Sequence, residues 1–263
     1  MDSIISKEGT VRAVIAGART SKEADLIVSL FTPTGHMRVY AYGAKKSRTR
    51  FLGALDLFTT IDAELRPSRK SGFGMPTLGS AIVRNARLGL RDDLGKIALA
   101  AYVVELVTHV GPDGAGEGAG ARDLFDLLTD TLDQLAKTSA SSVLRRAFEL
   151  RLLSAIGCQP ELSGCVVCGC PLDEARTFLD LIRGGVLCSR HKEAAKEVGP
   201  RTLAWMRHVL SIDGRTRDDT DDPAEDSAEK AARRAGPYLD GFLSHHIDRP
   251  LRSMDMLRDC QID

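Results

Sequence analysis

The chain has 263 residues, 43% of them hydrophobic, which is enough for one large domain or two smaller ones, each with its own core. Its 36 basic and 36 acidic residues cancel, so the total charge indicates no class of partner. No run approaches the roughly 20 apolar residues of a membrane helix. The first residues lack the basic segment and following apolar run of a signal peptide. Six cysteines without an export signal indicate a reducing compartment, and we expect a cytoplasmic protein.

The N-terminal part of the sequence has the pattern of short strands separated by turns. Apolar residues alternate with polar ones, or form compact runs, in about eighty residues. Five strands of this kind are typical of a small Greek-key barrel such as an OB-fold, although an SH3-like barrel has the same periodicity. The strands are expected at residues 11–16, 26–31, 37–42, 58–65 and 77–83.

From about residue 92 the apolar residues repeat with the period of a helix. A further helix is expected to begin near Pro200, and a last one carries Leu239, Phe242 and Leu243. The acidic segment 218–226 is too polar to fold alone and is expected to be a solvated loop. The first three helices are predicted from apolar faces at Ile97, Ala101, Val104 and Thr108, at Leu124, Leu128, Leu132 and Leu135, and at Leu144, Phe148, Leu152 and Ala155.

The sequence therefore predicts an α+β multi-domain protein. An OB-fold β-barrel occupies residues 1–82, and an all-α domain follows in residues 83–263. A zinc-finger module is inserted in the helical domain at about residues 158–195.

Two closely spaced pairs of metal ligands define this module. Cys165 and Cys168 form the first pair, Cys188 and His191 form the second, and nineteen residues separate them. Each pair fits one turn, and a loop of about 15–20 residues lets the two turns close a tetrahedron around zinc. Four protein ligands leave no open position for water, so the pattern predicts one structural Zn²⁺ ion. Cys170 lies close enough to replace Cys168 or His191, and buried thiols without a metal are the alternative interpretation.

Positive charge gathers in the barrel sequence. Residues 1–80 hold twelve basic and seven acidic residues, a net charge of +5, so the rest of the chain carries −5. A predicted loop at residues 43–51, here called the basic loop, has four cations in six positions. Spaced, mobile cations bind phosphate backbones, because their binding releases condensed counterions. The candidate DNA contacts are Lys45, Lys46, Arg48 and Arg50, together with Arg38.

Three aromatic residues lie near these cations. Tyr40, Tyr42 and Phe51 could offer ring faces to unstacked bases, or they could belong to the core beside a solvated loop. The sequence lacks the phosphate-binding glycine loop, the nucleophile elbow and the two-histidine zinc motif of hydrolases. These absences give no positive evidence for an enzyme or for a small-molecule substrate.

Several segments, in order along nearly the whole chain, resemble those of the bacterial DNA repair protein RecO family. Two features depart from the family pattern: His191 stands where a cysteine is more usual, and the acidic segment 218–226 resembles an insertion. The segments that carry the resemblance are Glu8–Val11, Ala24–Thr32 with Gly35, Tyr42–Phe51 with Leu55 and Phe58, Gly157–Leu162, Cys165, Cys168–Gly169, Gly184–Cys188 and Arg249–Met254.

The resemblance implies a recombination mediator rather than an enzyme. Such proteins bind single- and double-stranded DNA, contact RecR and the single-strand-binding protein, help to load the recombinase and anneal complementary strands. It also implies an OB-fold, a helical domain and a zinc module, with the basic loop at the DNA. Two other hypotheses remain: a zinc-stabilised protein–protein adaptor without a direct DNA role, and a metal-dependent nuclease or hydrolase, which would need an open coordination site.

Overall fold

The computed structural model forms two compact units. The first comprises Met1–Asp93 with Ala100–Lys137, and the second comprises Leu94–Leu99 with Thr138–Asp263. The predicted boundary between residues 82 and 83 stays a prediction. Most of the acidic segment 218–226 lies outside the described residues, which are 9–68, 74–113, 120–172, 176–193, 195–211, 225–247 and 249–262.

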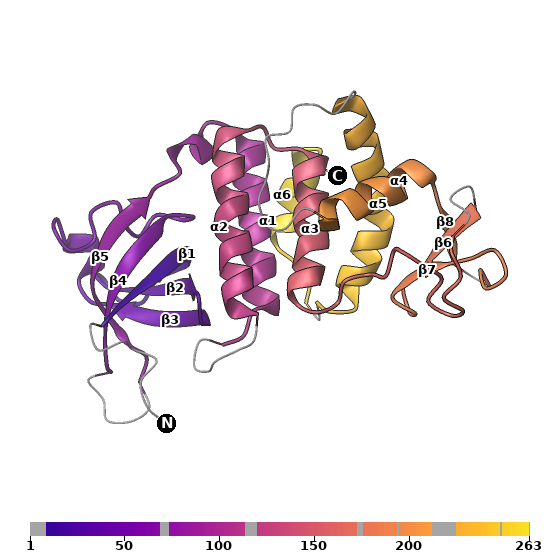
Figure 1. The fold of residues 1–263 in the computed structure, drawn as a ribbon. Helices are drawn as coiled ribbons and strands as arrows, with labels where there is room; N and C mark the ends of the chain where they lie inside the picture. Colours follow the sequence, from indigo (N-terminus) through magenta and orange to yellow (C-terminus); the bar gives the residue numbers. More distant parts are fainter. Residues whose placement is uncertain are drawn as a thin grey trace. The chain divides into compact units, whose positions relative to one another are not determined.

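Five strands of the first unit close into a barrel (Figure 1). Their order around the barrel is β1-β2-β3-β5-β4. All neighbours are antiparallel except β3 and β5, which pair in parallel between Tyr40 and Thr77. This closed barrel confirms the predicted N-terminal fold class. The strands are β1 (Thr10–Thr20), β2 (Leu26–Thr32), β3 (Gly35–Ala41), β4 (Thr60–Arg66) and β5 (Thr77–Asn85).

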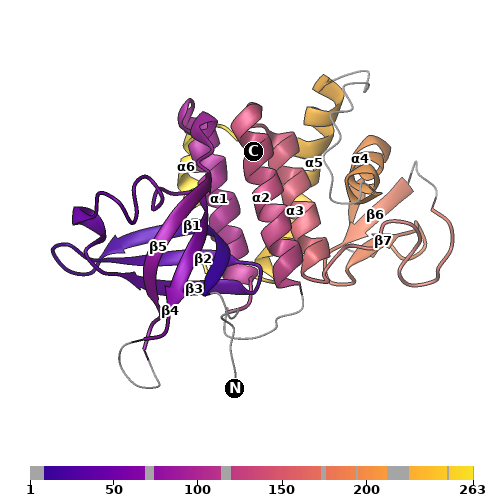
Figure 2. The ribbon, with the colours of Figure 1, turned by 60° about the vertical axis from the view of Figure 1, so that its left-hand side comes forward.

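Alternate side chains of these strands fill the barrel, whose strands are seen from another side in Figure 2. Because successive side chains on a strand point to opposite faces, every second residue turns inward. Ala44, Phe51 and Ala54 reach into the same core from the long connection between β3 and β4. The inward strand residues include Ala13, Ile15, Val28, Leu30, Val39, Ala41, Ile61, Ala63 and Leu78, each with 0% exposure.

Helix α2 (Ala121–Lys137) also belongs to the first unit and contacts β2, β3 and the short helix η2 (Leu88–Arg91). Its predicted apolar face is confirmed, because the four leucines of that face are at most 2% exposed. Helix α1 (Leu94–Val110) precedes it in the chain.

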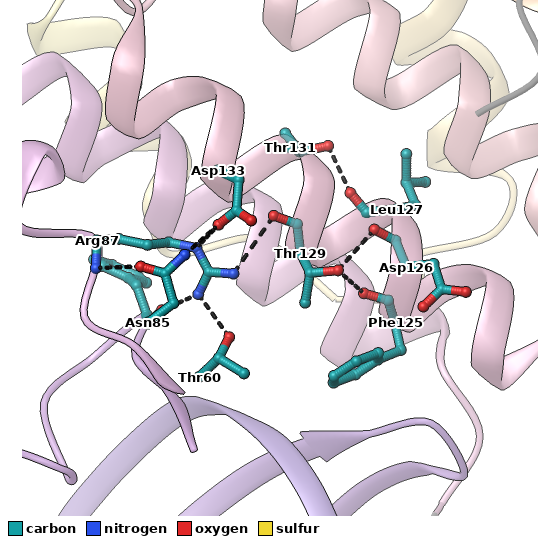
Figure 3. Close-up of polar contacts among 10 residues, drawn as sticks. Thr60, Asn85, Arg87, Phe125, Asp126, Leu127, Thr129, Thr131 and Asp133 are labelled. Carbon is teal, nitrogen blue, oxygen red and sulfur yellow. Dashed lines mark hydrogen bonds and ion pairs between the residues drawn. The ribbon is translucent and has the colours of Figure 1, made fainter. Parts of the chain in front are cut away.

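One buried arginine joins the barrel to α2 (Figure 3). The guanidinium of Arg87 donates to the carbonyl of Phe58 at 2.6 Å, to the Thr60 hydroxyl at 2.8 Å and to the Asp133 carboxylate at 2.5 Å. Asn85, at the end of β5, donates to the same carboxylate at 3.0 Å. Burial lowers the pKa of Arg87, and the nearby Asp133 carboxylate partly offsets this shift. Two strands and a helix therefore share one buried charge.

The second unit is helical and carries a small sheet. Its sheet has the order β7-β6-β8. The helical domain is confirmed, including the helix that begins at Pro200, but the sequence did not predict the sheet. The elements are α3 (Ser142–Ala155), β6 (Thr177–Asp180), β7 (Gly185–Leu187), β8 (Lys196–Val198), α4 (Pro200–Ser211), α5 (Glu225–Ser244) and α6 (Ser253–Asp259).

Buried ion pairs link the helices of this unit. Glu149 of α3 is 0% exposed and accepts from Arg145 at 2.9 Å and from Arg146 at 2.8 Å. Arg146 also pairs with Asp240 of α5, and Arg145 donates to the carbonyl of Ile262 at 2.8 Å. Buried charges need such partners, because an unpaired charge is costly to remove from water. The network thus ties α3 to α5 and to the C-terminal segment.

Replacing Arg87 by lysine should destabilise the first unit. A lysine keeps the charge but cannot span the carbonyl, hydroxyl and carboxylate that the guanidinium joins, so we expect a loss of about 2–4 kcal/mol in the free energy of unfolding. Urea denaturation followed by circular dichroism measures this change.

The matched control is Arg91→Lys, because Arg91 pairs with Asp56 and both side chains are about half exposed (53% and 54%). An exposed pair of this kind contributes at most about 1 kcal/mol. Equal effects of the two substitutions would contradict the role given to Arg87.

Candidate functional site

The basic loop begins against the turn between β1 and β2. Asp25 in this turn accepts from the backbone N–H of Gly43 at 2.8 Å and from the Tyr40 hydroxyl at 2.9 Å. The backbone N–H of Lys45 donates to the carbonyl of Ala24 at 3.0 Å. The same two hydrogen bonds lower the pKa of the Asp25 carboxyl, the one from Gly43 more strongly. A charged carboxylate therefore holds the start of the loop in place.

All five predicted DNA contacts are exposed. The Lys46 ammonium lies 3.3 Å from the Glu23 carboxylate, in a pair that is largely exposed. Arg50 donates to the carbonyl of Tyr42 at 2.7 Å. Within the described residues, Arg38, Lys45, Arg48 and Arg50 form no ion pair with a carboxylate. The site therefore has cations that an anionic ligand can reach.

Strand register places further residues on the same outer surface as Arg38. Directly paired residues of antiparallel strands lie on one face of a sheet. Ser29 pairs with Arg38, while Ile27 pairs with both Tyr40 on β3 and Arg19 on β1. The basic face is defined as the basic loop together with Arg19, Ile27, Ser29, Arg38, Tyr40 and Tyr42. In OB-folds, the face of strands 2 and 3 with the adjoining loops is where oligonucleotides bind.

Two cations, one on this face and one in the turn beside it, were missing from the predicted site. Arg19, at the end of β1, and Lys22, in the following turn, are both exposed. The sequence carried no signal for Arg19. Arg19 lies on the same face as Tyr40 only because both residues pair with Ile27 of β2. Lys22 lies close enough to Asp25 to lower the pKa of its carboxyl.

The three candidate aromatic residues have different environments. Phe51 is 4% exposed and belongs to the barrel core, whereas Tyr42 is 41% exposed. Tyr40 is partly buried, and its ring centroid lies 4.3 Å from that of Tyr42. The core interpretation therefore holds for Phe51, and the two tyrosines lie on the outer surface.

The second candidate site is a cluster of thiols in the second unit. The Sγ atoms of Cys165, Cys168, Cys170 and Cys188 lie within 4.8 Å of one another. The Nδ1 atom of His191 lies 3.6 Å from the Cys165 sulfur and 3.4 Å from the Cys188 sulfur. The structure thus gathers four thiols, three of them predicted ligands and the fourth Cys170, and it places the predicted ligand His191 beside two of these thiols, Cys165 and Cys188.

These distances fit a metal held by sulfur and nitrogen. With metal–sulfur bonds of about 2.3 Å and metal–nitrogen bonds of about 2.0 Å, a tetrahedron separates two sulfurs by about 3.8 Å, and a sulfur and a nitrogen by about 3.5 Å. The sulfurs of Cys168 and Cys188 are 4.0 Å apart, and both distances from His191 lie close to the second value. The cluster could therefore hold a metal ion.

Backbone hydrogen bonds shape the two ligand turns. The backbone N–H of Gly169 donates to the carbonyl of Cys165 at 2.7 Å, and that of His191 donates to the carbonyl of Cys188 at 3.0 Å. Gly169 has a φ of 67°, a left-handed conformation that glycine adopts without a steric penalty. Each pair of ligands is thus folded back on itself by its own turn.

The thiols of the cluster differ in proton affinity. Burial raises the pKa of Cys165, but hydrogen bonds from neighbouring backbone groups and His191 outweigh it and lower the pKa to about 5. Burial also raises the pKa of Cys188, but hydrogen bonds, including one from His191, lower it to about 7 overall. A backbone hydrogen bond from Cys170 lowers the pKa of Cys168, but nearby thiols and burial raise it to about 11 overall. Thiolates are the form that binds metals.

The comparisons with known proteins identify the class of protein that carries these two sites. Residues 6–86 match the family described as "Recombination protein O N terminal", and residues 91–255 match "Recombination protein O C terminal". The chain therefore belongs to the RecO family, whose members are recombination mediators rather than enzymes.

Individual relatives agree over nearly the full length. The chain is 34% identical to "DNA repair protein RecO" of Anaeromyxobacter sp. (strain K) over 260 residues, which covers 98% of this chain and 96% of that protein. It is 33% identical to the protein of the same name from Geobacter metallireducens over 252 residues, covering 95% of this chain and 97% of the relative.

None of the described helices is both long and apolar enough to cross a membrane.

Removing the Asp25 carboxylate should loosen the start of the basic loop. In Asp25→Ala, the N–H of Gly43 loses its acceptor, so we expect its amide hydrogen to exchange faster, and that of Lys45 with it. Hydrogen exchange followed by NMR measures both amides. Asp56→Ala is the control, because it removes an exposed carboxylate that pairs with Arg91. Unchanged exchange in Asp25→Ala would contradict the anchoring role.

Proposed function

We propose that this chain is a cytoplasmic, DNA-binding recombination mediator that holds DNA on its basic face. The observation that carries the proposal is the set of exposed cations on the outer surface of a five-stranded barrel, in a chain of the RecO family. The net charge of the whole chain is zero, so attraction to DNA must come from local charge.

Neutralising phosphates on one surface also accounts for annealing without a nucleotide. Two DNA strands repel each other, and cations that bind both backbones lower this repulsion. We infer that the protein binds single- and double-stranded DNA and promotes annealing of complementary strands. RecR and the single-strand-binding protein are the proposed protein partners, with recombinase loading as the shared outcome. These partners follow from the family resemblance.

Replacing the four cations of the basic loop should weaken DNA binding. In the variant with Lys45, Lys46, Arg48 and Arg50 changed to alanine, we expect a lower affinity and a smaller salt dependence. Each lost phosphate contact flattens the slope of log affinity against log salt by about 0.7 on single strands, so the slope should fall by about 3. Fluorescence anisotropy at several salt concentrations gives both quantities.

The control variant changes four exposed arginines of the second unit to alanine: Arg176, Arg201, Arg234 and Arg249. It removes the same charge outside the basic face and should leave the slope nearly unchanged. Strand annealing without nucleotide, with and without the single-strand-binding protein, should be slower only in the basic-loop variant. Unchanged DNA affinity in that variant would favour the protein–protein adaptor instead.

We further propose that the cysteine-rich site holds one structural zinc ion. Cys165, Cys168, Cys188 and His191 are the proposed ligands, because the two distances from His191 suit a shared tetrahedron. Zinc would join the two ligand turns and stabilise the module around them. Four protein ligands leave no open position, which argues against the hydrolase hypothesis. In this assignment Cys170 is a neighbouring thiol outside the ligand set.

Zinc content tests the ligand set residue by residue. Protein purified without chelator should carry one zinc per chain by mass spectrometry of the metal, and chelation should speed hydrogen exchange in residues 158–195 more than in the barrel. His191→Ala should lose most of the zinc, whereas Cys170→Ser should retain it.

Cys158→Ser is the control, because Cys158 lies outside the cluster. Retention of zinc in His191→Ala, with loss in Cys170→Ser, would assign the fourth position to Cys170. Absence of stoichiometric zinc from all of these proteins would contradict the metal site.

A further inference from the structure

Tyr42 holds a special position on the basic face. Along β3 the inward residues Val39 and Ala41 are 0% exposed, and Tyr42 follows at the next outward position with 41% of its surface exposed. The basic loop starts at the next residue. Tyr42 is thus an aromatic ring at the junction between the sheet surface and the cations.

A neighbouring tyrosine braces this ring. The centroid of the Tyr40 ring lies 4.3 Å from that of Tyr42, with an angle of 46° between the planes. The hydroxyl of Tyr40 donates to Asp25 at 2.9 Å, which holds the supporting ring in place. A ring that is ordered before binding loses less conformational entropy when a ligand arrives.

A cation that contacts the backbone of Tyr42 is also held in place. Arg50 donates from Nη2 to the carbonyl of Tyr42 at 2.7 Å, and its Cζ atom lies 4.9 Å from the centroid of the Phe51 ring. Phe51 is part of the barrel core, so this contact anchors the guanidinium to a rigid element. The guanidinium is therefore fixed at the backbone of the residue that carries the exposed ring.

This pairing matches the chemistry of a nucleotide that is not in a duplex. An unpaired base exposes a flat face that stacks on aromatic rings, and its phosphate binds a cation. In a duplex, the faces of the bases are covered by their neighbours, and only the backbone and the base edges stay accessible.

We propose that Tyr42 is the base-stacking residue of the basic face and that it gives the face a preference for single-stranded DNA. The ring of Tyr42 stacks on an unpaired base while Arg50 and the lysines of the basic loop hold the flanking phosphates. This inference rests on the proposed DNA-binding function and adds to it the form of DNA that the face selects.

Substitutions at Tyr42 test the proposal directly. Tyr42→Leu keeps an apolar side chain but removes the ring, and Tyr42→Phe keeps the ring. For the full chain and a single-stranded oligonucleotide of mixed sequence, we expect Tyr42→Leu to weaken affinity about tenfold and Tyr42→Phe to restore it to within about twofold. Affinity for the matching duplex should change less than about twofold, because its base faces are covered.

The salt slope and a fluorescent base separate stacking from electrostatics. Because Tyr42 is uncharged, its loss should leave the slope of log affinity against log salt unchanged. Oligonucleotides that carry 2-aminopurine report stacking through quenching, which should be weaker with Tyr42→Leu than with the unchanged protein. Leu88→Ala, which truncates an exposed apolar residue outside the basic face, is the control and should behave as the unchanged protein.

The possible outcomes distinguish this inference from the proposed function. Equal losses on single strands and duplexes, or no loss on either, would overturn the stacking role of Tyr42. If the four-alanine variant of the basic loop loses affinity for both forms of DNA, the proposed function stands even when Tyr42→Leu has no effect. If that variant binds both forms normally, the proposed function fails, and the role of Tyr42 fails with it.

Discussion

Within the described part of the first unit, one buried positive charge, that of Arg87, holds several elements together. Removing a guanidinium from water is costly, and the cost is offset only where carbonyl, hydroxyl and carboxylate oxygens converge on it. Phe58 supplies an oxygen from the turn before β4, Thr60 supplies one from the start of β4, and Asp133 supplies one from α2. Because the charge is satisfied only when these elements are together, it couples the barrel to its helix (Figure 3).

The basic face follows a different physical rule. Its cations are exposed, and within the described residues most of them pair with no carboxylate. Their electrostatic attraction for an incoming anion is therefore not already satisfied within the protein. Lys46, which pairs with Glu23, is the exception. Asp25 has a different role in this arrangement. Its carboxylate is used by backbone and tyrosine donors, which fix the loop without neutralising the lysines and arginines around it.

Much of the fold was predictable, because periodicity reports which side of an element is buried. The alternation predicted for β1, β3 and β4, the compact apolar run of β2 and the leucine face of α2 all correspond to elements of the structure. The small sheet β6-β7-β8 was missed, because strands of three or four residues are too short for a period to emerge. The buried charges of Arg145, Arg146 and Glu149 were also missed, since a charged residue on a helix ordinarily predicts an exposed face.

The sequence by itself determined the barrel followed by helices, the concentration of positive charge in residues 43–51 and the gathering of potential ligands around Cys165 and Cys188. Composition, period and spacing are local properties, and the chain carries them whatever its fold. Only the tertiary structure decided that Phe51 is in the core while Tyr42 is on the surface, and that Cys170 joins the cluster. Such choices depend on which residues distant in sequence fill the same space.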